Sequence, residues 1–368
     1  AAVPPYGESA YARTRKRLAL APPGTDGGVL KLDGTFGLHP GLKGLHERWQ
    51  AGELTVLHAL ATPYRERSHF DGQDVLENGT AGPHARSGWL NRALEFLPGP
   101  PPGREAGLGM ALAQSVPTVL RGDAPVDSWA PSPLPELDGD TLDRLADLYS
   151  EDPFFATRLA RALATDGLAE QAMGVSARPG RQRRGRRGGG AFPSLARAAG
   201  GFLAAPDGPR VAVLELGGWD THANQGAGQG QLANRLATLD RGIEALRQSL
   251  GPAWAQTAVI AVSEFGRTAA ENGTGGTDHG TAGAAFLVGG AVRGGRVVSD
   301  WPGIRKSALY EGRDLMPTLD ARSVFKGVLR DQLGVPGGAL EREVFPESGR
   351  AQPTDELIRE PAAGGRIA

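Results

Sequence analysis

Carboxylate and imidazole side chains recur directly after the short apolar runs of this sequence. The stretch "WDTH" places Asp220 and His222 two positions apart, "TDHG" holds Asp278 and His279, and Glu264 opens "EFGRT". Alternate side chains of an extended segment project to the same side, so Asp220 and His222 suit joint coordination of one cation. A mixed imidazole and carboxylate set suits zinc, manganese or a similar ion. We therefore expect a divalent metal site, with one or two ions, built from these five residues.

Each of these patterns also has a simpler interpretation. A Trp-Asp turn with a hydrogen-bonded histidine is the alternative for Asp220 and His222, and a turn capped by Asp278 is the alternative for that residue. Glu264 stands three positions before Arg267, and the two side chains are able to form an ion pair. Both interpretations stay open at each position on the sequence alone.

Ser68 is the candidate nucleophile. It lies in "RERSHFDGQDVLENG", after an apolar run and before a helical stretch. A hydroxyl at a helix N-terminus meets free backbone N–H groups and the positive end of the helix dipole, which favour a phosphoryl or sulfuryl group there. The alternative role is an N-cap, with Asp71 supporting the first helical turn.

Further polar residues flank Ser68 and the later motifs. Arg65, Arg67 and Arg267 are candidate donors to the oxygens of an anion, although each is also compatible with an ordinary surface position. His69 is two positions from Asp71, and it is one of three histidines in the chain that follow an apolar run and lie close to an aspartate. We therefore treat His69, Asp71 and Arg67 as additional candidates for the site.

The elements that must position these residues are predicted from apolar patterning. Apolar runs at residues 54–60, 210–216, 257–262 and 284–288 are typical of buried strands. Residues 232–250 carry leucine and isoleucine at alternating spacings of four and three, which predicts a helix that crosses between the second and third strands. Helical patterns also occur at residues 140–149, 153–164 and 322–333, and a helix leads into the first strand.

This order of elements predicts an α/β fold with a largely parallel sheet. Ligand sites in such sheets form beyond the carboxyl ends of the strands. The polar loops after the apolar runs therefore lie where chemistry is expected.

Composition excludes several classes of function. The 40 basic and 41 acidic residues nearly cancel, so no global field draws the chain to nucleic acid or to an anionic membrane. No apolar run approaches the length of a membrane span, and the first residues lack the apolar core of a signal peptide. With zero cysteines, histidine and carboxylate groups are the metal ligands of note. A small or local partner is expected.

One segment differs from the rest in composition. Residues 178–190, "RPGRQRRGRRGGG", hold six arginines among glycine and proline. One interpretation is a loop that binds an anion or nucleic acid. The other is a solvated, flexible surface loop, and the lack of interleaved aromatic residues favours the solvated loop. The tail after Glu347 is expected to be extended and weakly packed.

Six motifs in order resemble the DUF1501 family, which is placed in the alkaline phosphatase and sulfatase superfamily. They are "RSHFDGQD", "GGWDTHANQ", "SEFGRT", "NGTGGTDHG", "FLVGGAVRGG" and "GRDLMPTLD", and the resemblance runs from about Pro4 to Phe345. It implies a three-layer α/β/α sandwich with a mostly parallel central sheet. We therefore expect one alkaline-phosphatase-like domain over residues 1–346 and an extended tail over residues 347–368.

The resemblance also implies roles for individual residues. Ser68 takes the place of the superfamily's nucleophile, and Asp220, His222 and His279 look like the ligands of one metal site. Glu264 stands where the strand-end aspartate of a second site is expected, and Phe265 stands where a histidine usually follows it.

Two expectations concern what precedes the "VPPYG" segment and where the protein works. Members of the family usually carry an early strand with a metal-ligating aspartate before that segment, and this chain begins past that region. The family commonly bears a twin-arginine export signal, so a periplasmic or cell-envelope location is expected.

These observations favour a metal-dependent hydrolase of phosphate or sulfate esters, with Ser68 as nucleophile and Arg267 steadying a non-bridging oxygen. Its partner is a small anionic ester; nucleic acid is not expected. The alternative is a non-catalytic binding or structural protein of the envelope that retains the fold. The sequence does not define the ester, the metal or the oligomeric state.

Limited trypsin digestion tests the interpretation of residues 178–190. A solvated Arg-rich loop without apolar anchors is expected to be cut before any other part of the chain. Mass spectrometry of the first fragments identifies the cleavage site. Resistance of this segment while other sites are cut would show that the segment is docked, and would favour the anion-binding interpretation.

Overall fold

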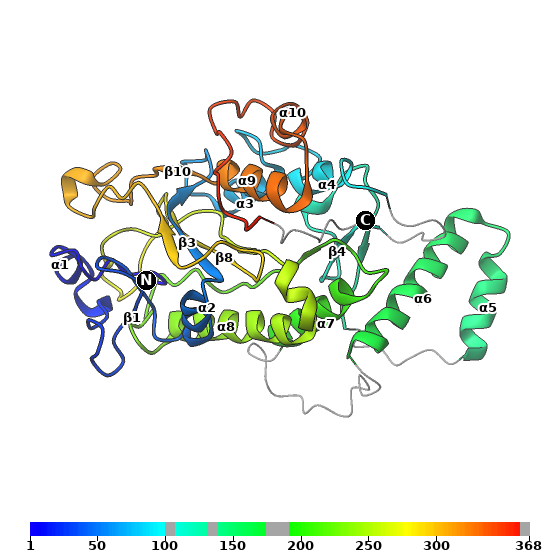
Figure 1. Ribbon diagram of the computed structural model, residues 1–368, viewed down its shortest axis with the longest axis horizontal. Helices are drawn as coiled ribbons and strands as arrows, with labels where there is room; N and C mark the ends of the chain where they lie inside the picture. Colours follow the sequence, from blue (N-terminus) through cyan, green and yellow to red (C-terminus); the bar gives the residue numbers. More distant parts are fainter. Residues whose placement is uncertain (100–106, 132–138, 174–190, 361–368) are drawn as a thin grey trace.

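The computed structural model of the chain describes residues 1–99, 107–131, 139–173 and 191–360 (Figure 1). The Arg-rich segment at residues 178–190 and the last part of the tail lie outside these ranges. The strands are β1 (Leu30–Lys31), β2 (Gly37–Leu38), β3 (Leu54–Ala61), β4 (Gly109–Ala111), β5 (Val126–Ser128), β6 (Val211–Val213), β7 (Val259–Ala261), β8 (Gly283–Val288), β9 (Arg296–Val298) and β10 (Leu319–Asp320). The helices are α1 (Tyr11–Arg15), α2 (Lys43–Gln50), α3 (His69–Asn78), α4 (Trp89–Leu94), α5 (Gly139–Tyr149), α6 (Pro153–Met173), α7 (Ala191–Ala204), α8 (Gln231–Leu250), α9 (Ala321–Leu333) and α10 (Gly337–Ala339).

Strand β3 lies at the centre of the larger sheet, and all eight of its residues are buried. Successive side chains of a strand point to opposite faces, so its two faces contribute to two different cores. Val56 joins Phe286 of β8 and Leu236 of α8 in one core. Leu57 joins Phe325 of α9 in the other. Helices therefore cover both faces of this sheet, with α2, α7 and α8 on one side and α3, α4 and α9 on the other (Figure 1).

The larger sheet is mixed in direction, which corrects the expectation of a mostly parallel central sheet, whereas the sheet around β4 is parallel. Strands β5, β4 and β6 form a parallel sheet of three. In the larger sheet β3 is parallel to β9 and β10, but β8 runs antiparallel to both β3 and β7. The connection from β7 to β8 contains no helix, and a chain that does not cross over returns in the opposite direction.

The strand, helix and strand expected over residues 210–262 all form, but the two strands belong to different sheets. Strand β6 pairs with β4, whereas β7 pairs with β8. A cavity of about 1220 Å³ is lined by residues of β6, β7, α8 and α9. The apolar stripe of α8 has its expected position, because Leu236, Ile243 and Leu246 are buried in the core that α8 shares with β3.

The other predicted helices are confirmed. Helix α5 and helix α9 match their expected ranges within one residue, and α6 extends beyond the expected end to Met173. Helices α5 and α6 project away from the sheets that contain β3 and β4 (Figure 1). Within the described ranges, no helix combines the length and the apolar character that a membrane crossing requires.

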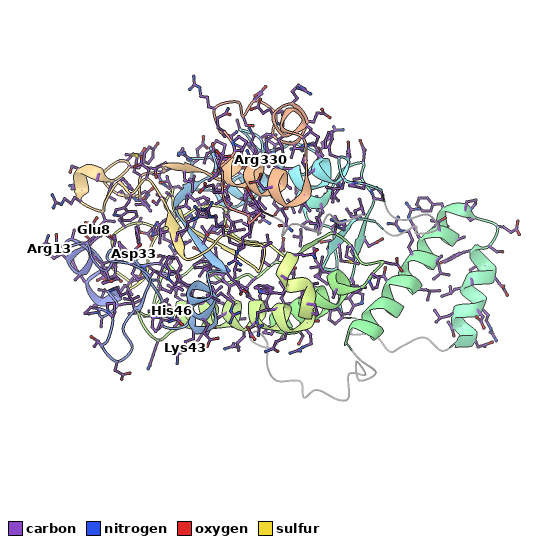
Figure 2. All side chains as sticks on the ribbon, viewed as in Figure 1. Glu8, Arg13, Asp33, Lys43, His46 and Arg330 are labelled. Carbon is purple, nitrogen blue, oxygen red and sulfur yellow. The ribbon has the colours of Figure 1, made fainter. Side chains whose placement is uncertain are left out.

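The first part of the expected tail is packed against the domain and is not weakly attached. The ammonium group of Lys326, fully buried on α9, donates hydrogen bonds to the carbonyl oxygens of Ser348 and Ala351 at 3.0 and 2.9 Å. Leu357 is also fully buried. Arg330, which lies on α9 (Figure 2), donates to Asp355 at 2.9 Å.

Two buried histidines brace the core near the N-terminal segment. The Nε2 atom of His58 lies 3.0 Å from the carbonyl oxygen of Val3, and the ring sits beside a bulge at Ala59, whose φ is 55°. His39 makes the matching contact to the carbonyl oxygen of Ala227 at 2.8 Å. Burial lowers the pKa of each imidazole to about 4, because the charged form is poorly solvated there. Both rings are therefore neutral in the folded protein at pH 7.

The depressed pKa values of His39 and His58 predict acid sensitivity. The folded state binds these two rings in their neutral form, so their full contribution to the unfolding free energy is present above the unfolded-state histidine pKa of 6.5. That contribution is lost as pH falls toward about 4. Each ring is expected to remove about 2 kcal/mol of unfolding free energy between pH 7 and pH 5. Urea unfolding at both pH values measures the loss. His58→Gln, which cannot titrate, should lose about 2 kcal/mol less than the wild type; an equal loss in the two proteins contradicts the assignment.

Candidate metal centre

The predicted site residues of three loops meet beyond the ends of β3, β6 and β7. Ser68 and His69 follow β3, Asp220 follows β6, and Glu264 follows β7. The side chains of His69 and Asp220 are about two-fifths exposed, so the cluster is open to solvent. The cavity that β6 and β7 line also reaches His69, Asp220 and Glu264.

Three imidazole rings in this cluster share one arrangement: each Nδ1 atom contacts an oxygen acceptor. The pairs are His69 with Glu264 Oε1 at 2.7 Å, His222 with Asp278 Oδ1 at 3.1 Å, and His279 with the carbonyl oxygen of Arg67 at 2.9 Å. A carboxylate or carbonyl oxygen accepts but does not donate, so a neutral ring that donates to this acceptor carries its proton on Nδ1. In that tautomer the lone pair of each ring is on Nε2, which is the form that binds a cation.

The three Nε2 atoms converge on Asp220. His222 Nε2 and His279 Nε2 lie 2.9 and 3.2 Å from Asp220 Oδ1, and His69 Nε2 lies 3.4 Å from Oδ2. The two nitrogens of His222 and His279 are 3.0 Å apart. Ligands of a tetrahedral zinc ion, with bonds of about 2.0–2.1 Å, are separated by about 3.3 Å. The donor atoms therefore have nearly the spacing of a coordination sphere.

The electrostatics of this arrangement favour a cation. Lone pairs that face each other and a carboxylate repel unless a positive charge lies among them. The Nε2 atom of His69 is buried and, among the described residues, has no hydrogen-bond partner. His69, Asp220 and His279 offer ligand atoms that all lie within 4.8 Å of one another. The residues fit a divalent metal held by imidazole nitrogen and carboxylate oxygen.

Two carboxylates of the cluster are held in their charged form. Partial burial acts to raise the pKa of Asp220, but a hydrogen bond from Arg267 and nearby positive charge outweigh it and lower that pKa. Hydrogen bonds from Asn272 and His222 lower the pKa of Asp278. Ionised carboxylates are the form that binds a cation and orients a histidine.

Asp278 and Glu264, both predicted as ligands, lie one layer behind the converging nitrogens. Each accepts a hydrogen bond from a histidine Nδ1 and so fixes the orientation of that ring. The alternative ion pair between Glu264 and Arg267 is not found in the described structure. Arg267 instead donates Nη1 to Asp220 Oδ1 and Nη2 to the carbonyl oxygen of Thr277.

Ser68 occupies the N-cap position of α3, as its alternative role requires, but its hydroxyl makes no capping hydrogen bond. Its backbone N–H donates to the Tyr64 hydroxyl at 3.1 Å. The Tyr64 hydroxyl donates in turn to Asp71 Oδ2, in the first turn of α3, at 3.4 Å. The Ser68 side chain therefore has no capping function, and Ser68 directly precedes His69 in the chain.

The flanking arginines are engaged away from the converging nitrogens. Arg65 donates to the carbonyl oxygens of Thr62 and Tyr64 at the end of β3. Arg67 pairs through its side chain with Asp314 at 2.8 Å and Glu311 at 2.6 Å. Only the main-chain oxygen of Arg67 contacts a ring of the cluster.

Sequence reasoning missed the residues that support the cluster. Asn272 donates to Asp278 Oδ1 at 3.0 Å, and Gln225 accepts from both Thr221 and Thr277 at 3.0 and 2.8 Å. The Asn-Gly pair at residues 272–273 marks a turn but carries no information about its partner. Phe265, noted as a departure, packs against His69 and His279 with ring centroids 4.9 and 5.1 Å apart.

This cluster of histidines and aspartates, at the end of a mixed α/β fold, lies within the part of the chain that a family model matches. The family model described as protein of unknown function (DUF1501) matches residues 54–344, which is more than half of the chain. The chain belongs to the DUF1501 family. Neither the curated proteins nor the solved structures searched include a match.

Removing an Nε2 donor is expected to weaken metal binding. His222→Ala and His279→Ala each delete one converging nitrogen and should lower zinc or manganese affinity at least about tenfold, since loss of an outer partner alone costs that much. Isothermal titration and elemental analysis after dialysis measure the change. His46→Ala is the control, because His46 lies on α2 and contacts the carbonyl oxygen of Lys31 (Figure 2). Unchanged metal content in both cluster variants contradicts the proposed ligand set.

Proposed function

We propose that the protein is a metal-dependent hydrolase of phosphate or sulfate esters and that it belongs to the alkaline phosphatase and sulfatase superfamily. Two features of the fold support the superfamily assignment. Helices cover both faces of the sheet around β3, and the candidate residues follow the ends of β3, β6 and β7. We also propose a periplasmic or cell-envelope location, as is common for the family.

The convergence of three histidine Nε2 atoms on Asp220 is the observation that carries the proposal. His69, His222 and His279 come from loops after three different strands, and each is oriented by a separate acceptor. Oriented imidazoles with a carboxylate between them are a site for zinc or manganese. A bound divalent cation supplies Lewis-acid polarisation of the ester and stabilises negative charge on its oxygens.

Ser68 provides the nucleophilic oxygen in this proposal. Its Oγ forms a bond to phosphorus or sulfur, the bond to the ester oxygen breaks, and the departing alcohol takes up a proton. Water then cleaves the serine ester and releases phosphate or sulfate. The N-terminus of α3 would assist, because the first N–H groups of a helix and the positive end of its dipole favour an anion there. The absence of a capping bond leaves the hydroxyl available for this step.

Arg267 has a role in the metal-free site and another in the site with a bound cation. In this structure its Nη1 donates to Asp220 Oδ1 and supplies the positive charge beside that carboxylate. When Asp220 ligates the cation instead, this nitrogen is released to donate to a non-bridging oxygen of the substrate. Its remaining bond to Thr277 keeps the guanidinium at the site.

A non-catalytic binding protein of the envelope is the second candidate, and Phe265 favours it. Phe265 fills the position next to Glu264 where the superfamily resemblance implies a histidine, and its ring packs on the cluster. Among the described residues, a single group of three potential ligands meets the spacing of a metal site. One cation without a second is also compatible with a structural role.

Ser68→Ala separates catalysis from capping. Because the hydroxyl makes no capping bond, the variant should change the unfolding free energy by less than about 0.5 kcal/mol. Metal content should stay at the wild-type level, while hydrolysis of an aryl phosphate or aryl sulfate with added zinc or manganese should be lost. Ser68→Thr keeps an oxygen nucleophile and should retain partial activity.

The controls decide between the two candidate functions. An alanine variant that hydrolyses these esters at the wild-type rate contradicts the role of Ser68. A wild-type protein that binds metal but cleaves no phosphate or sulfate ester supports the binding-protein candidate.

A further inference from the structure

Asp314, the buried partner of Arg67, is neither one of the converging donors nor an acceptor of a histidine Nδ1. It lies in "GRDLMPTLD", and its side chain has no exposed surface. Its Oδ2 atom accepts a hydrogen bond from Arg67 Nε at 2.8 Å, and its Oδ1 atom accepts one from Arg313 Nη1 at 2.9 Å. A carboxylate is costly to bury unless it is paired, so this pairing with two arginines is a constraint on the local structure.

Both arginines that Asp314 holds also contact His279. The main-chain oxygen of Arg67 accepts the hydrogen bond from His279 Nδ1 at 2.9 Å. Arg313 Nη2 donates to the main-chain oxygen of His279 at 2.8 Å. Asp314 is therefore connected to the ring of His279 by one route and to its backbone by another.

The route through Arg67 depends on an uncommon backbone conformation. Arg67 has a φ of 63°, in the left-handed region that residues with a Cβ atom rarely adopt. This conformation directs its carbonyl oxygen to His279 while its side chain extends to Asp314. The ion pair at the buried end of the side chain thus favours the conformation at the backbone end.

The position of Asp314 is itself fixed by a tight turn. Its main-chain oxygen accepts from Tyr310 N at 2.9 Å, and its main-chain N–H donates to the Tyr310 oxygen at 3.0 Å. Asp314 also forms a bridge with Thr268, which follows Arg267 directly. The Asp314 carboxylate is therefore held in one position, and it pairs there with the two arginines that contact His279.

We propose that Asp314 is a positioning residue that holds His279 in the orientation and tautomer that present Nε2 to the cation. The inference rests on the proposed function in that it assumes the cation site. Asp314 does not touch the converging atoms and acts through Arg67 and Arg313. Partners that orient a ligating histidine contribute about ten- to a hundredfold to metal affinity.

Asp314→Asn tests this role with two readouts. In the metal-free wild type, nitrogen NMR should show His279 as the single tautomer with the proton on Nδ1, and Asp314→Asn should lose that single state. The zinc affinity of the variant, measured by titration, should fall about ten- to a hundredfold. Glu311→Gln is the matched control, because Glu311 binds the same arginine at 2.6 Å from a largely exposed position. It should change zinc affinity by less than about threefold.

A double-variant cycle shows whether Asp314 acts through Arg67. Arg67→Met should reproduce the tautomer change, and the double variant should bind zinc about as weakly as Asp314→Asn alone, since Asp314→Asn already breaks the route that Arg67→Met removes. If Asp314→Asn does not fold, Arg67→Met carries the same test, because Arg313 still pairs with Asp314.

Three outcomes are informative. Wild-type affinity and tautomer in a folded Asp314→Asn overturn the inference, as does strict additivity in the cycle. If the wild type binds no zinc, the proposed cation site fails, and the tautomer readout alone decides the role of Asp314: loss of the Nδ1–H state supports it, and retention overturns it.

Discussion

The repulsion between aligned nitrogen lone pairs and a carboxylate is the constraint on which the candidate site depends. Three rings place Nε2 toward Asp220, and each is held in that orientation by an acceptor behind it. Without these acceptors the rings would turn so that an N–H faced the carboxylate, which is the more favourable contact in the absence of a cation. The second layer of the site therefore determines what the first layer is able to bind. Arg267 offsets part of the negative charge of Asp220.

The sequence predicted much of the site because the chemistry of its residues is local. The pair Asp220 and His222 and the residue His279 were identified from their types and their positions after apolar runs, and the structure brings them within 3.2 Å of a common oxygen or of each other. The buried strand at residues 54–61 and the apolar stripe of α8 could be predicted for a similar reason. Both follow from the spacing of apolar residues along a short segment of sequence.

Other features were not readable because they depend on contacts between distant segments. Glu264 and Asp278 are carboxylates, a residue type that binds metals. They orient His69 and His222 instead because of where those two rings lie in the folded chain. The direction of β8 depends on which strands it joins, which no local pattern encodes. The left-handed conformation of Arg67 and the burial of Asp314 are coupled across 247 residues. A charged residue in a short polar motif gives no sign of that coupling.

The wide sequence separation of the cluster has a consequence for folding. His69 and Glu264 are 195 positions apart, and Arg67 and His279 are 212 apart, so the site forms only after large loops close. Closing these loops costs conformational entropy. The contacts of the cluster offset that cost only when all three segments are in place. This chain has no cysteine to tie such segments together. A cation that binds only the assembled cluster acts as a reversible cross-link among three distant parts of the polypeptide, and its binding free energy adds to the stability of the whole domain.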